Sequence, residues 1–258
     1  MPKERLDIGA EIKFSGDRVL AIFPFNPQDG CGEALMTFED FRKLGKGFTR
    51  IRSVTITDGG NMRNARSFRL DQKEHAQLPR LVKNDLFACP SSRLEVKSGS
   101  ALLAPLLQQL KKTSFAASMS LLHSGEPTEA FLRTQINVNT NLKTLLLEGA
   151  WPDAFDRFLF ELLFKPNMVE IDTRKASNSF TLNFLKGVVA KWQRKKKTAV
   201  LKGRTSATEE EMVAIVKPNG TSTCGCSSGQ VHIHHSDDRG HSITMKYNGS
   251  GMFHLQMK

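Results

Sequence analysis

The chain has 258 residues, of which 39% are hydrophobic and 24% charged, and its formal net charge is +11. This length is enough for one large hydrophobic core or two smaller ones, and the composition is that of a globular protein. The sequence contains no run of eighteen apolar residues, and its four cysteines are too few for a disulfide framework. We therefore expect a globular protein with reduced cysteines and no membrane partner.

Residues 1–37 are predicted to form an N-terminal β region. Residues 10–25 read as two short extended runs on either side of Ser15-Gly16-Asp17, which is typical of a tight turn. The first fourteen residues contain charges but lack the apolar block of a secretory signal. We therefore expect a cytoplasmic protein.

Residues 38–215 alternate between helix-like and strand-like segments, which predicts an α/β repeat region. The predicted helices are 38–45, 78–88, 101–112, 126–136, 151–164 and 180–193, and the strands that follow them are 51–58, 93–99, 114–124, 142–149, 168–173 and 198–204. The later strands begin near residues 93, 115, 142, 168 and 198, so they are 22 to 30 residues apart. This spacing favours an irregular, leucine-rich-repeat-like α/β solenoid, with an open parallel sheet as the alternative.

The helix at 151–164 illustrates the pattern. Pro152 is expected at its first helical position, and Pro166 is expected to stop it. The residues predicted to form its inward stripe are Phe155, Phe158, Leu159 and Leu162. The aromatic residues in this stripe are therefore interpreted as core rather than as a cofactor box.

Residues 216–258 are predicted to form a C-terminal antiparallel β meander, packed on the same domain. A helix at 208–216 precedes it, and a polar, turn-rich segment follows that helix. Three extended runs, 230–236, 241–248 and 252–258, are joined by short segments that contain glycine. The fold class expected for the whole chain is therefore α/β.

One long segment resembles a known family. The run NLKTLLLEGAWPDAFDRFLFELLFKPNMVEIDT (141–173), followed by FTLNFLKGVVAKWQ, is similar to the F-box-associated C-terminal domain of nematode F-box proteins. The matching features are a Leu-rich strand ending in Gly149, a Trp-Pro pair opening a helix, and a Pro-Asn pair before the next strand. The likeness covers roughly residues 90–258. It implies substrate recognition for a ubiquitin ligase through protein–protein contacts, although no F-box is visible near the N-terminus.

The sequence shows none of the common catalytic motifs. It has no phosphate-binding glycine loop with the required spacing, no nucleophile elbow, no zinc-protease helix motif and no kinase signature. We therefore expect no enzymatic activity and no cofactor, and we interpret the chain as a protein-recognition module with protein partners.

A basic segment supports a competing hypothesis. Residues 174–204 contain ten basic residues and no acidic one. Within it, Arg194, Lys195, Lys196 and Lys197 follow Trp192 at the predicted end of a helix, where the helix dipole favours cations. Trp192 itself is expected to be buried. The same four cations are candidate ligands for RNA or an acidic partner, and a candidate nuclear-localisation signal.

The segment CGCSSGQVHIHH is the last candidate site. Zinc sites favour two to four residues between cysteines and three to five between histidines. Here one residue separates each pair, Cys224 from Cys226 and His232 from His234. We therefore expect no metal at these four candidate ligands unless His241 or His254 converges on them, and we interpret the cluster as exposed surface.

Overall fold

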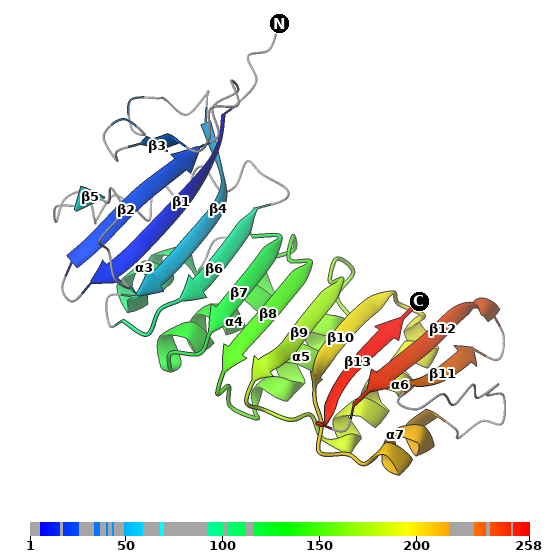
Figure 1. Cartoon of the computed structure of the whole chain (residues 1–258). Helices are drawn as coiled ribbons and strands as arrows, with labels where there is room; N and C mark the ends of the chain where they lie inside the picture. The colour runs from blue at the N-terminus through cyan, green and yellow to red at the C-terminus, as the bar shows by residue number, and fades with distance from the viewer. Residues whose placement is uncertain are drawn as a thin grey trace, which may run out of the picture. The chain divides into compact units, whose positions relative to one another are not determined.

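The computed structural model describes residues 6–15, 18–25, 34–36, 40, 43, 49–58, 68–69, 92–100, 103–111, 116–216, 230–235, 238–248 and 250–258. The chain divides into two compact units, Met1–Leu142 and Lys143–Lys258 (Figure 1). No helix in the described parts of the chain is both long and apolar enough to cross a bilayer.

Strands of the first unit lie in the order β3-β2-β1-β4-β6-β7, and β5 pairs with β2. Their bounds are Leu6–Ser15 (β1), Arg18–Phe25 (β2), Ala34–Met36 (β3), Thr49–Asp58 (β4), Phe68–Arg69 (β5), Arg93–Lys97 (β6) and Ser118–Leu122 (β7). The pairs β1–β4, β4–β6 and β6–β7 are parallel. Strand β2 is antiparallel to β1, β3 and β5. The predicted N-terminal strand pair is therefore present as β1 and β2.

The core of the first unit follows one row across the parallel strands. Ile12, Ile56, Val96 and Leu121 are register partners on β1, β4, β6 and β7, and each is fully buried. The helices α3 (Leu103–Leu110) and α4 (Glu126–Val138) supply further buried leucine and phenylalanine side chains. Both lie behind the strands of this unit in Figure 1.

Strands of the second unit lie in the order β8-β9-β10-β13-β12-β11. Their bounds are Thr144–Gly149 (β8), Glu170–Ala176 (β9), Ala199–Arg204 (β10), Gln230–His235 (β11), Asp238–Tyr247 (β12) and Met252–Met257 (β13). The first three strands are parallel and the other three are antiparallel. The last strand of the chain therefore lies inside the sheet, between β10 and β12.

Three helices cover one face of this sheet, α5 (Phe155–Leu163), α6 (Leu182–Lys195) and α7 (Glu209–Val216). In Figure 1, α5 and α6 lie behind the strands, and α7 lies next to α6. The sheet buries a row of register partners against them, in which every member is fully buried: Leu145, Ile171, Leu201, Leu255 and Met245. Because side chains alternate along a strand, the neighbouring row points to the other face.

Local signals explain where α6 begins and ends. The Thr181 hydroxyl accepts a hydrogen bond from the backbone N–H of Phe184 at 3.2 Å, which caps the first turn. Lys196 ends the helix in the left-handed conformation, with φ at 49°. The predicted burial of Trp192 is confirmed, since its side chain is fully buried in the inward stripe of this helix.

The helix predicted at 151–164 starts later than expected. Pro152 lies in a tight turn, in which its carbonyl accepts from the N–H of Phe155 at 2.9 Å, and α5 begins only at Phe155. Phe158 is half-buried, and Leu163 is buried in the stripe with Phe155, Leu159 and Leu162. A proline suits the first position of such a turn as well as that of a helix, so its presence did not distinguish the two.

The mixed α/β class is confirmed, with largely parallel strands in a sheet that does not close on itself. The predicted helix at 78–88 lies outside the described residues, as does most of the one at 38–45. The predicted domain boundaries at residues 37 and 215 stay predictions.

Candidate functional site

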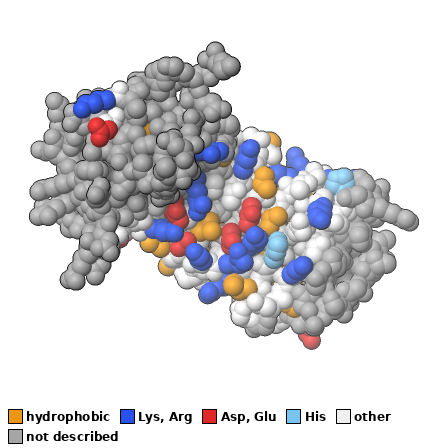
Figure 2. Space-filling model, turned by 45° about the horizontal axis from the view of Figure 1, so that its top comes forward, with side chains coloured by type: hydrophobic (Ala, Val, Ile, Leu, Met, Phe, Trp, Pro, Cys, Tyr) orange, Lys and Arg blue, Asp and Glu red, His pale blue; other side chains and the backbone are white. Residues whose placement is uncertain are grey.

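The candidate site is the face of the second sheet that points away from α5, α6 and α7, called here the open face. Its members come from five strands and alternate along each of them, except at Arg174 and Lys175, which are consecutive beside a register shift between β8 and β9. They are Thr144, Leu146, Glu148, Glu170, Asp172, Arg174, Lys175, Val200, Lys202, Arg204, Thr244, Lys246, Met252, His254 and Gln256. Basic, acidic and apolar side chains lie side by side on the described surface visible in Figure 2.

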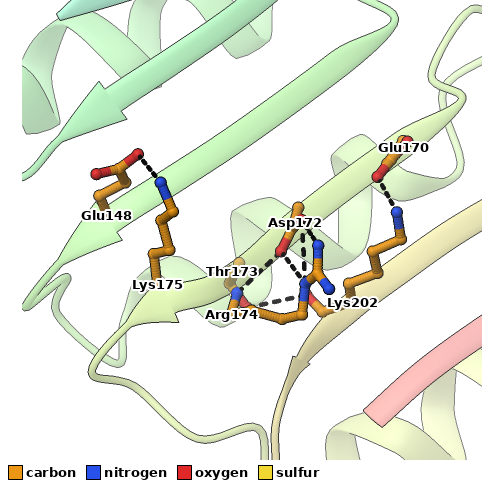
Figure 3. Close-up of polar contacts among 7 residues, drawn as sticks. All are labelled: Glu148, Glu170, Asp172, Thr173, Arg174, Lys175 and Lys202. Atoms are coloured by element: carbon orange, nitrogen blue, oxygen red, sulfur yellow. Dashed lines mark hydrogen bonds and ion pairs between the residues drawn. The ribbon is translucent and has the colours of Figure 1, made fainter. Parts of the chain in front are cut away.

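Three ion pairs hold the acidic residues of the open face (Figure 3). Lys202 on β10 contacts Glu170 on β9 at 2.5 Å, and Lys175 on β9 contacts Glu148 on β8 at 3.2 Å. Each of these pairs joins neighbouring strands. A shift of register between β8 and β9 places Glu148 opposite Lys175.

The third pair joins Asp172 to Arg174 on the same strand. The guanidinium donates from Nε at 3.1 Å and from an Nη at 2.7 Å to the two carboxylate oxygens, and the Arg174 backbone N–H adds a bond of 3.0 Å. Burial by itself would raise the pKa of Asp172, but these hydrogen bonds and the charges of Arg174 and Lys202 outweigh it and lower the pKa. Asp172 is therefore a buried, ionised carboxylate at neutral pH.

Two cations of the open face remain without an acidic partner. Arg204 and Lys246 are exposed, and neither forms an ion pair among the residues that the structure describes. His254 lies in the same row as Lys202 and Lys246, as their register partner on β13. Burial first, and then the charges of these two lysines, lower the pKa of His254, so its imidazole is neutral at pH 7.

The predicted basic run 194–197 has a different position. It lies at the end of α6, behind the sheet. Arg194 and Lys195 are exposed, whereas the Lys197 ammonium donates to the carbonyl oxygens of Leu163, at 3.0 Å, and Lys165. Burial lowers the pKa of Lys197 to about 8. Lys197 thus stabilises the last carbonyls of α5, and binding through the other three cations stays a prediction.

Residues 174–204 form one basic tract in the sequence, but the fold places its members at different locations. Four of them, Arg174, Lys175, Lys202 and Arg204, lie on the open face, and none belongs to the run 194–197. The two-residue period of β10 finds Lys202 and Arg204, because buried positions alternate there with more exposed ones. β9 lacks this period, since Arg174 and Lys175 are consecutive exposed residues.

The Cys/His cluster is only partly described. Cys224 and Cys226 lie outside the described residues. The backbone register places His232 and His234 opposite Thr244 and Ser242 on β12. His241 shares the face of the buried Ile243, which is the other face of β12 from Thr244. His241 therefore does not share a face with Thr244, the register partner of His232.

His254 lies on β13, and β12 separates this strand from β11. Two strand spacings separate β11 from β13, or about 10 Å. Within the described part of the chain, no three His, Cys, Asp or Glu residues are arranged to hold a metal ion. Metal binding by Cys224 and Cys226 stays untested by this arrangement.

Described residues also line two hollows. A groove of about 350 Å³ lies between α3 and α4 and is lined mainly by apolar side chains, among them Leu107, Ala130 and Phe131. A space of about 10 Å³ lies beside Trp151 and Asp156, which leaves room for no more than a water molecule. Burial, and then the charge of Asp153, raise the pKa of Asp156 to about 6.

The fold and the open face together define a mixed α/β protein that covers one sheet face with helices and leaves charged side chains on the other. Comparison of the chain with protein-family models, curated proteins and solved structures finds no match.

Proposed function

We propose that this chain is a non-catalytic protein-recognition module and that the open face of its second unit binds the partner. One observation carries the proposal. The described helices of the second unit lie on one side of its sheet, while the open face combines three ion pairs with half-buried apolar side chains such as Leu146 and Val200. Such a surface offers a partner both apolar contacts and the polar groups that form the rim of protein interfaces.

The proposal includes the role implied by the F-box-associated likeness, namely substrate recognition for a ubiquitin ligase. The residues of the likeness have clear structural roles, which supports it. Gly149 ends β8 with φ at 86°, and the indole N–H of Trp151 donates to the Glu148 carbonyl at 3.0 Å. Trp151 is buried and packs edge-on against Phe155 with ring centroids 5.1 Å apart. The strand, turn and helix of the motif are therefore joined by these contacts.

We also propose that the repeat region is an irregular, leucine-rich-repeat-like solenoid. Each of the parallel strands β6, β7, β8, β9 and β10 is followed along the chain by one helix, α3 to α7. Four of these strands, β6, β7, β8 and β10, contribute buried apolar residues at alternate positions, such as Leu94 and Val96 on β6. Repetition of one strand and one helix is the basis of such solenoids.

The experiment that tests recognition is affinity purification of the full chain followed by mass spectrometry. We expect reproducible protein partners, including the adaptor subunit of a ubiquitin ligase or its substrates. Lys246→Glu should lose them, and Lys186→Glu, on the exposed surface of α6, should keep them as a matched charge reversal. Recovery of RNA without a reproducible protein would contradict the proposal.

Nucleic-acid binding through residues 174–204 is the second candidate function. The observation in its favour is that Arg174, Lys175, Lys202 and Arg204 gather on one face. Binding of single-stranded and double-stranded RNA should then weaken steeply with salt, because phosphate contacts release counterions. Arg194→Ser with Lys195→Ser tests the helix-end run separately, and a flat salt response would remove this candidate.

A further inference from the structure

The open face carries a row of basic groups across three neighbouring strands. Lys202 on β10, His254 on β13 and Lys246 on β12 are register partners, so their side chains stand next to one another. The two lysines lie on either side of the neutral His254 imidazole, and their charges help to hold its pKa down. A bound anion would offset the positive charge of this row, whereas another cation would add to it.

The described cations of the open face outnumber its carboxylates, and the excess positive charge lies in one part of the face. Five cations, Arg174, Lys175, Lys202, Arg204 and Lys246, stand against three carboxylates, Glu148, Glu170 and Asp172. All three carboxylates belong to β8 and β9, where they are paired. The two cations left over, Arg204 and Lys246, lie on β10 and β12, on either side of β13. The part of the face that attracts anions is therefore the part around His254.

The neighbouring residues favour a carboxylate-rich peptide over a nucleic acid. No Phe, Tyr or Trp is among the described members of the open face, so these residues offer the bases of a nucleic acid none of the rings on which bases usually stack. The carboxylates on β8 and β9 would repel a continuous phosphate backbone that crossed the sheet. Met252 and Val200, both half-buried, offer apolar contacts to a protein segment beside the cations.

From this arrangement we propose that the open face binds an acidic segment of a partner protein, whose carboxylates lie against Lys246, His254 and Arg204. This inference rests on the proposed recognition function and specifies the chemistry of its partner.

Binding of carboxylates would change the protonation of His254. The charges that surround it come from three strands: Lys202 on β10, Lys246 on β12, and Glu170 and Arg174 on β9. The cations hold its pKa down and Glu170 opposes them. Carboxylates beside the ring would raise the pKa, so the acidic segment should bind more tightly as the pH falls from 7 towards 6.

The experiment titrates the full chain with an oligo-glutamate peptide, an oligo-serine peptide of equal length and single-stranded oligothymidylate of equal charge. Histidine ring protons are followed by NMR, with His254→Gln to assign the signal. We expect oligo-glutamate to bind and to raise the His254 pKa, and oligo-serine to leave it unchanged. Lys246→Gln should weaken binding about threefold, the effect of one exposed ion pair. Lys186→Gln, on α6, should leave the binding of oligo-glutamate unchanged.

Three results would overturn the inference. The first is equal binding of oligo-glutamate by Lys246→Gln and by the wild type. The second is tighter binding of oligothymidylate than of oligo-glutamate. The third is that the wild type binds neither of these two ligands. Affinity purification separates failure of the inference from failure of the proposed function. Protein partners that remain bound to Lys246→Gln with Arg204→Gln would exclude the acidic-segment site and leave recognition standing, whereas absence of any protein partner would contradict recognition itself.

Discussion

The ammonium of Lys197 donates a hydrogen bond to the carbonyl oxygen of Leu163 at 3.0 Å, across 34 residues of the chain. Leu163 is the last residue of α5, and Lys197 follows the end of α6. The last carbonyls of a helix have no partner within it, and its C-terminus favours a positive charge. Lys197 therefore links two neighbouring helices, which explains its partial burial beside the exposed Arg194 and Lys195.

Replacement of Lys197 should lower stability. Lys197→Ala removes the donor for the α5 carbonyls, and we expect the free energy of unfolding to fall by about 1 kcal/mol, the usual effect of a lost hydrogen bond. Urea denaturation at pH 7 measures this change. Lys195→Ala is the matched control, because Lys195 is exposed on the last turn of α6. Equal stability of the two variants would contradict the role assigned to Lys197.

Gly203 lies where β10 crosses the aromatic core. A Cβ at this position would lie 2.7 Å from the Phe180 ring and 2.7 Å from the Thr173 hydroxyl. The Phe180 ring is stacked on Phe184 at 4.4 Å, so it cannot move without disturbing its neighbour. Gly203→Ala should therefore lower the free energy of unfolding by about 2 kcal/mol, as overpacked cores do.

Gly187 is the control for this substitution. It lies inside α6, and a Cβ there would meet the nearest atom of Phe160 at 3.4 Å, which is ordinary contact. Gly187→Ala should raise the free energy of unfolding by up to about 1 kcal/mol, because alanine favours the helix. Thermal unfolding of the two variants should therefore show a lower melting temperature for Gly203→Ala and a higher one for Gly187→Ala. A neutral Gly203→Ala would show that β10 has room for a side chain.

Asp156 should make stability depend on pH. Its pKa in the folded chain is about 6, raised from 3.8 by burial and by Asp153, so its protonated form is favoured by folding. This contribution is present below pH 3.8 and is lost as the pH rises through 6.

Asp156→Asn should therefore stabilise the protein at pH 7, by about 1 kcal/mol after allowing for solvent screening, and should have little effect at pH 4. Urea denaturation at both values measures the difference. The carboxyl resonance of Asp156 should titrate near pH 6 and shift to lower pH in Asp153→Asn. A midpoint near 4 in the wild type would contradict the prediction.

Asp172 should have the opposite pH dependence. Its pKa is lowered, because the bonds and charges of Arg174 together with the charge of Lys202 outweigh its burial. The stability that it contributes is present above its unfolded pKa of 3.8 and is lost as the pH falls through the lower folded value.

Arg174→Gln should raise the pKa of Asp172 and lower the free energy of unfolding at pH 7, by about 1 kcal/mol for this half-exposed pair. The loss should shrink at pH 3. The control is Arg157→Gln, which removes an exposed ion pair on α5 and should change stability by less than about 0.5 kcal/mol. Urea denaturation at pH 7 and pH 3 compares the two variants. A loss for Arg174→Gln that is equal at both pH values would contradict the role of the ion pair.

The sequence by itself determined the alternation of strands and helices from residue 93 to residue 204. Both kinds of element are set by local properties, namely hydrophobic period, helix caps and breaking residues. Thr181 before α6 and the period-2 pattern of β10 are visible without any structure. The start of α5 was placed too early, because Pro152 suits both a turn and a first helical residue.

Only the tertiary structure decided which charges act together. Glu148 and Lys175 are 27 residues apart and meet because of a register shift between β8 and β9. The chain order of the strands also gives no hint that β13 lies between β10 and β12, which brings His254 beside Lys202 and Lys246. Register and strand order depend on how distant segments pack together, whereas hydrophobic period and capping depend on residues a few positions apart. For this reason, the sequence alone predicts the elements of this protein but not its charged face.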